Sequence, residues 1–165
     1  MNENYIVING KKAELTEEQL KALGIEVGKN PFARVGKRER YMFIDADNIV
    51  TSVTGDDIGF GNKFYSSVNY FNNRAFAEQV ALHQLLYRKL LKFAYDNNCI
   101  DTAKWRRYSQ HWFIYYDWDT KEIRPDLAIV AQQFSTIYFS TMKAAQRAIN
   151  EVVKPFMKAH PEFVW

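Results

Sequence analysis

The chain has 165 residues with a net charge of +3; 47% of its residues are hydrophobic and 16% are aromatic. This length suits one buried core, or two small units that share one, and the composition argues against disorder. The only cysteine, Cys99, excludes an intramolecular disulfide and a cysteine zinc cluster. The N-terminus has no leader pattern, and no apolar run reaches the roughly twenty residues that cross a membrane. We therefore expect a cytoplasmic protein without a membrane segment.

A small appendage is expected before the main domain. Residues 5–15 read as a hairpin around Asn9-Gly10, because both central positions of a two-residue turn need positive φ. A capping-box spacing then predicts a two-turn helix over Glu17 to Leu23. Residues 1–28 are thus expected to be appended to a single domain at 29–165.

The first half of the domain reads as strands and loops. Residues 29–40 are expected to form a linker. Strands are predicted over Tyr41 to Ile44 and Ile49 to Val53, on either side of an Asp-rich turn. The glycine-containing stretch from Thr54 to Lys63 is expected to be a flexible connection, followed by a strand from Phe64 to Phe71.

A long helix follows and organises the rest of the chain. Asn73 is a typical N-cap, and apolar residues then recur at three- and four-residue spacing up to Asp96. About twenty helical residues are predicted, ending at Asn97-Asn98. Residues 101–110 are expected to form an irregular linker.

A second copy of the pattern follows at an offset of about 70 residues. Strands are predicted from Trp112 to Tyr116 and around Ile123, with Pro125 confining the return strand to a sheet edge. Thr141 then caps a helix that should end or kink at Pro155. The pattern indicates an internal duplication, although any two strand-turn-strand-helix units resemble one another.

The expected fold class is α+β. An N-terminal β-hairpin and short helix should precede two repeated ββ(β)α units, at about 38–98 and 105–158. We expect the antiparallel strands to form one or two sheets with the helices on one face.

Five motifs in a fixed order carry a family resemblance: Tyr41–Asp45, Asn69–Phe71 with Ala77-Glu78, Lys92–Asn98, Ile114–Asp117 and Ile137–Thr141. In this respect residues 38 to 153 resemble a widespread family of small uncharacterised phage and prophage proteins. That family often has glycine where this chain has Val68. The resemblance implies a mobile-element context, and it carries over no catalytic residue and no ligand.

Three pairs of aspartates raise the question of a metal site: Asp45 and Asp47 in one turn, Asp56 and Asp57 in the connection at 54–63, and Asp117 and Asp119 in a second turn. Carboxylate oxygens suit Mg²⁺ or Ca²⁺, but neither turn follows the calcium-loop pattern. Asx-type turn chemistry explains the spacing better. We expect neither a metal nor a cofactor.

Other candidate groups are scattered. His83, His111 and His160 show no zinc-ligand spacing, and a pair of His83 with Cys99 lacks a motif. The glycines of residues 59–63 do not have the spacing of a phosphate-binding loop, which leaves a hairpin loop as the assignment. No catalytic residue is predicted, and we expect the protein not to be an enzyme.

One cluster combines cations with aromatic rings, and it consists of Lys104, Trp105, Arg106, Arg107, Tyr108, His111 and Trp112. Cations neutralise phosphates, and aromatic faces accept stacked bases, which suits flexible nucleic acid. A secondary basic surface of Arg34, Lys37, Arg38 and Arg40 could extend it if the linker folds beside it. The alternative is that the two tryptophans are core residues and the cations a solvated face.

We therefore expect a phage or prophage accessory protein that binds a host protein or nucleoprotein, including anti-CRISPR-type inhibition of a defence component. The partner class follows from the resemblance alone. Two alternatives stay open: direct nucleic-acid binding through the basic and aromatic cluster, and assembly by self-association into a homo-oligomer.

Overall fold

The computed structural model describes residues 5–8, 11–14, 30–54, 58–106 and 108–165, and it confirms an α+β fold. Three antiparallel sheets have two strands each. The strands are β1 (Tyr5–Ile8), β2 (Lys11–Glu14), β3 (Arg40–Ile44), β4 (Val50–Thr54), β5 (His111–Asp117) and β6 (Glu122–Ala128). The helices are α2 (Ile58–Ser66), α3 (Arg74–Asp96), α4 (Met142–Ala148), the π-helical η1 (Ile149–Val153) and α5 (Lys154–Ala159).

The N-terminal hairpin forms as expected, with β1 paired to β2. Its turn at residues 9–10 and the helix expected over Glu17 to Leu23 lie outside the described residues. So do Asp56, Asp57 and Arg107.

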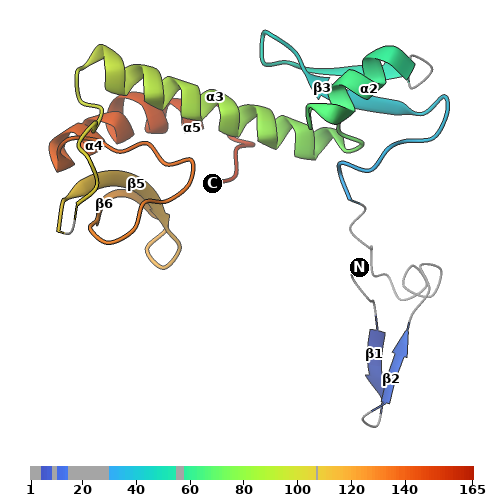
Figure 1. Cartoon of the computed structure of the whole chain (residues 1–165), viewed down its shortest axis with the longest axis horizontal. Coiled ribbons are helices and arrows are strands. Elements are labelled where there is room, and N and C mark those ends of the chain that lie inside the picture. Colours follow the sequence, from blue (N-terminus) through green and yellow to red (C-terminus); the bar gives the residue numbers. More distant parts are fainter. Residues whose placement is uncertain (1–4, 9–10, 15–29, 55–57, 107) are drawn as a thin grey trace.

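Helix α3 links two lobes (Figure 1). Its N-cap is confirmed: the Asn73 side chain accepts a hydrogen bond from the Phe76 N–H at 2.9 Å. Ala77 and Ala81, near its start, belong to the core of the first lobe, which contains β3, β4 and α2. From Leu82 onward its buried residues belong to the core of the second lobe, with β5, β6, α4, η1 and α5. Helix α3 therefore contributes buried residues to both cores.

The first lobe has helices on both faces of its hairpin, which differs from the expected one-sided arrangement. Side chains alternate along β3, so Met42 and Ile44 pack with α3, while Tyr41 and Phe43 face the other way. Phe64 of α2 covers this second face, and its ring stacks on that of Phe43 with centroids 4.1 Å apart.

The expected connection at 54–63 and the strand at 64–71 are both wrong over the described residues. Helix α2 occupies residues 58–66, and only Phe71 pairs with a strand, through an antiparallel bridge to Met42. The ring of Tyr41 lies close to Gly61, where an added Cβ would come within 3.7 Å of the tyrosine oxygen. That distance is an ordinary van der Waals contact, and aromatic packing between α2 and β3 outweighs the strand propensity of this segment.

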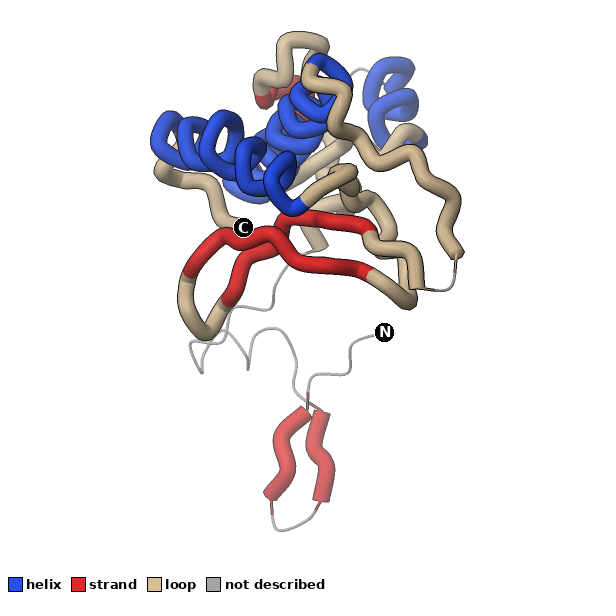
Figure 2. The backbone as a smooth tube through the Cα atoms, turned by 90° about the vertical axis from the view of Figure 1, so that its left-hand side faces the viewer, coloured by secondary structure: helices blue, strands red, loops and turns tan. Residues whose placement is uncertain are grey.

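The second lobe places its helices above the β5–β6 hairpin (Figure 2). Thr141 caps α4 by accepting a hydrogen bond from the Ala144 N–H at 3.1 Å, as predicted. The helix does not end at Pro155. Instead, the Lys154 N–H bonds to the Ile149 carbonyl five residues earlier, and this π turn continues into α5. A wider turn before proline accommodates its missing N–H group.

The two units share several positions at an offset of 68 to 70 residues. A Trp112–Phe139 bridge in the second unit corresponds to the Met42–Phe71 bridge in the first. The units also differ, because β5 and β6 are each two residues longer than β3 and β4, and because a loop replaces α2. The internal duplication therefore stays a prediction.

Within the described residues, no helix is long and apolar enough to cross a membrane.

Candidate functional site

Within the cluster, Lys104, Trp105, Arg106 and Tyr108 lie in the irregular segment between α3 and β5, whereas His111 and Trp112 belong to β5. Lys104, Arg106 and Tyr108 are exposed, and Trp105 is half-buried. His111, the first residue of β5, is only 1% exposed. The cluster therefore has an exposed part and a buried part with different roles.

The buried part is a chain of hydrogen bonds that fixes the segment to the sheet. Asp101 lies 2.6 Å from Nδ1 of His111, and the hydroxyl of Ser109 lies 2.7 Å from Nε2. The indole of Trp105 stacks on the imidazole, with ring centroids 3.8 Å apart and planes 18° from parallel. We call Asp101, His111, Ser109 and Trp105 the brace.

The order carboxylate, imidazole and hydroxyl matches a hydrolytic triad, in which a neutral imidazole takes the serine proton. In this structure, however, the Ser109 oxygen accepts the Arg106 N–H at 3.0 Å and donates to the Arg106 carbonyl at 2.8 Å. A hydroxyl has one proton to donate. Ser109 thus contacts both the Arg106 backbone and Nε2 of His111, and these contacts close the loop.

The exposed part borders a cavity of about 500 Å³, which is lined by Trp105, Arg106, Tyr108, Ile129 and Val130. Two loops thus form its walls, one before β5 and one after β6. Residues 102–110 contain three cations and no carboxylate, and residues 129–136 carry no charge. We call this the basic–aromatic cavity, and its local charge is positive.

The remaining predicted site residues divide between core and surface. Trp112 packs against the second core, as the alternative interpretation anticipated for the tryptophans, and His111 belongs to the brace. Sequence reasoning missed Asp101, Ser109, Ile129 and Val130. The sequence marks this second wall only weakly, by the apolar pair Ile129-Val130 directly after a strand that contains proline. The position of this pair opposite Trp105 depends on the fold.

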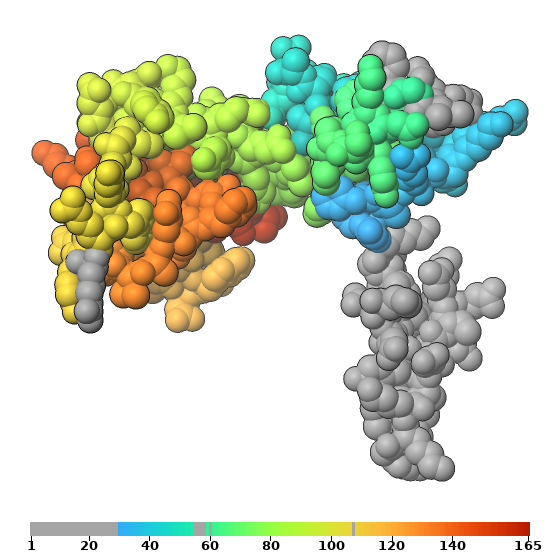
Figure 3. Space-filling view, in the orientation of Figure 1, coloured from blue at the N-terminus to red at the C-terminus, as the bar shows by residue number. Residues whose placement is uncertain are grey.

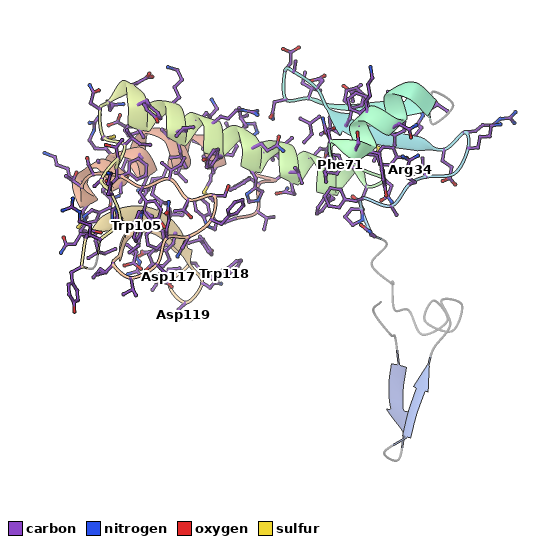
Figure 4. All side chains as sticks on the ribbon, viewed as in Figure 1. Arg34, Phe71, Trp105, Asp117, Trp118 and Asp119 are labelled. Carbon is purple, nitrogen blue, oxygen red and sulfur yellow. The ribbon has the colours of Figure 1, made fainter. Side chains whose placement is uncertain are left out.

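The secondary basic surface lies in the first lobe. Figure 4 labels Arg34 there and Trp105 in the other lobe. The guanidinium of Arg34 sits 4.2 Å above the ring of Tyr65, so the linker folds against α2. Arg34, Lys37, Arg38 and Arg40 therefore do not extend the basic–aromatic cavity.

The acidic turns hold themselves together by hydrogen bonds. Asp45 accepts N–H groups of Asp47 and Ile49 at 3.0 and 2.9 Å, and the Ile49 contact holds the pKa of Asp45 below its ordinary value. Asp117 accepts the N–H groups of the turn after it and pairs with Arg124 (Figure 4). No three potential metal ligands among the described residues gather in one place.

His83 and Cys99 do not meet. His83 lies in the middle of α3 beside Phe163, whereas Cys99 follows the end of that helix, about 20 Å further along the axis. Cys99 is buried, and burial raises the pKa of its thiol, which keeps it protonated.

Comparisons of the chain with family models, curated proteins and solved structures find no match.

Proposed function

We propose that this protein acts by binding, without catalysis, and that the basic–aromatic cavity contacts an anionic and flexible partner. One observation carries the proposal: two loops from different parts of the chain form a concave surface with an aromatic wall, the cation of Arg106 and no carboxylate. Aromatic rings stack on bases, and cations neutralise phosphates. A splayed segment of single-stranded nucleic acid within a nucleoprotein fits this chemistry.

The brace supports binding rather than turnover. It holds the ring of Trp105 by stacking and the backbone of Arg106 by two hydrogen bonds, so the Trp105 ring is positioned before a partner arrives. Pre-positioned side chains lose less conformational entropy on binding. The phage or prophage context, a site of action in the host cytoplasm and the identification of the partner as a host nucleoprotein or defence component rest on the sequence resemblance.

The test compares tagged variants purified from infected host cells. Lys104→Ala with Arg106→Ala removes two exposed cations, and Lys143→Ala, an exposed cation on α4, is the matched control. We expect the parent and the control to retain one host complex and the double variant to lose it. Equal recovery by all three would refute the assignment of the cavity.

Trp105 gives a second, independent readout. Loss of one stacked base weakens binding by about 1 to 3 kcal/mol, or roughly 5- to 150-fold. Trp105→Ala should therefore weaken binding of a fluorescent single-stranded oligonucleotide or of the purified complex. Trp118→Ala is the matched control, because Trp118 is 69% exposed at the β5–β6 turn. If only the complex responds, the partner is the nucleoprotein rather than free nucleic acid.

One observation favours self-association as a second candidate. Phe134 is 100% exposed and Val130 is 94% exposed, and both lie in the uncharged loop that borders the cavity. Where such side chains form one contiguous patch, the patch marks a surface that meets a partner. If sedimentation shows an oligomer that Phe134→Ser dissociates, this loop is an assembly contact.

A further inference from the structure

A second cavity lies beneath the middle of α3 and is separate from the basic–aromatic cavity. Its volume is about 520 Å³, and four parts of the chain line it: α3, β5, residues 135–139 and the C-terminal tail. The tail passes below α3 between the two lobes (Figure 3). We call this the α3 pocket.

The floor of the α3 pocket is apolar and belongs to the second core. Leu86, Leu90, Phe139 and Phe163 line it, and each is less than 9% exposed. Such residues are fixed by their packing with one another, so the floor exists before any ligand binds. Trp165 contributes a further half-buried aromatic ring.

The rim of the pocket is polar, and no Asp or Glu side chain lines it. Its polar side chains are His83, Gln84, Tyr87, Arg88, Ser135 and Thr136. Arg88 is the one permanently charged side chain among the lining residues. A ligand with one negative group would therefore meet attraction from Arg88 and no opposing side-chain charge.

Arg88 is held in position from the first lobe. It donates a hydrogen bond to the side-chain oxygen of Asn48, and the Asn48 amide donates to the Ala81 carbonyl at 3.0 Å. The guanidinium has five N–H groups, and the bond to Asn48 uses one. The remaining geometry suits the planar recognition of a carboxylate, phosphate or sulfonate.

We propose that the α3 pocket binds a small amphipathic anion, with its apolar or aromatic body on the floor and its charged group on Arg88. The volume lies within the range of about 300 to 1,000 Å³ that is usual for small-molecule sites. A nucleic-acid strand is disfavoured here, because successive phosphates call for several cations, whereas this pocket offers one above an apolar floor. The inference is independent of the basic–aromatic cavity.

The first experiment is a fluorescence titration with anilinonaphthalene sulfonate, an aromatic body that carries a single sulfonate. Arg88→Met should weaken its binding about tenfold or more and reduce the effect of salt, since a charge-assisted contact is lost. Lys89→Met is the matched control, because the neighbouring Lys89 lies outside the α3 pocket and borders a different groove. Equal affinity of the two variants would overturn the proposal.

Two further measurements guard against unfolding and against binding elsewhere. Thr136→Trp should fill the pocket and abolish binding without a change in the melting temperature, and unchanged binding in this folded variant would overturn the proposal. On the parent protein, decanoate should compete with the probe at least tenfold better than decanol. Equal competition would mean that the negative charge is not recognised.

Discussion

Val68 offers a test of how α2 is terminated. The Asn69 N–H bonds to the Phe64 carbonyl at 2.9 Å, and the Val68 N–H bonds to the Tyr65 carbonyl at 3.2 Å, which is the pattern of a Schellman cap. Val68 occupies the left-handed position of that cap at φ 58°, where glycine is usual. A β-branched residue is strained there, and it is 63% exposed, so its side chain contributes little burial.

Val68→Gly should therefore stabilise the protein. Relief of the left-handed conformation is worth about 1 to 2 kcal/mol, and the extra backbone freedom of unfolded glycine offsets about 0.5 to 1 kcal/mol. The net gain is about 0.5 to 1 kcal/mol, or roughly 1 to 4 °C in melting temperature. Urea unfolding followed by circular dichroism measures it, with an unchanged slope.

Asn98 provides the matched control. It ends α3 in the same cap position at φ 50°, with the Cys99 N–H bonded to the Ala94 carbonyl at 2.9 Å. Asparagine tolerates this conformation, so Asn98→Gly should change stability by only a few tenths of a kcal/mol. If Val68→Gly destabilises the protein, or if Asn98→Gly gains as much, the strain argument fails.

Three further perturbations test the caps, the brace and the acidic turn. Asn73→Ala and Thr141→Ala should each lower the free energy of unfolding by about 0.5 to 2 kcal/mol without abolishing the fold, and an unchanged urea midpoint would speak against the caps. Asp101→Asn weakens the buried hydrogen bond to Nδ1 of His111 and should cost about 1 to 3 kcal/mol in the same assay; an unchanged urea midpoint would mean that this contact does not hold the segment. The backbone N–H of Ile49 lowers the pKa of Asp45, so this carboxylate stabilises the fold above its ordinary titration range and the gain disappears as the pH falls through the lowered pKa. Asp45→Ala should consequently lose less stability than the parent between pH 7 and pH 3, and equal losses would contradict this.

The elements that sequence reasoning predicted correctly are those with a local signal. Helix α3 has a cap at Asn73 and an apolar stripe that no tertiary contact needs to create. The β3–β4 and β5–β6 hairpins combine strand periodicity with aspartate turns. Helix α2 has no such signal, because two of its residues are glycine and its aromatic side chains favour strands. Its helical state depends on Phe64 stacking on Phe43, which lies 21 residues earlier.

The candidate site likewise contains residues that a local sequence signal marks and residues that only the fold brings together. A local run of cations and aromatic rings marks one wall of the basic–aromatic cavity, and Lys104 and Arg106 are exposed in this run. The opposite wall, at Ile129 and Val130, is brought near by the β5–β6 pairing, which no single segment encodes. The role of His111 also depends on Asp101, ten residues before it, and on its burial at the start of β5.

The placement of both cores on α3 has a consequence for how the protein unfolds. Ala81 and Leu82 are adjacent in the chain yet belong to different cores, so the boundary between the lobes falls inside one continuous helix. If one lobe melts, the part of α3 that stays in the other lobe frays at its new end, inside the core that remains. Re-forming the first turn of a helix is costly. The two lobes are therefore expected to unfold in one cooperative transition, in which the amides around Leu82 exchange with solvent only when the whole domain opens.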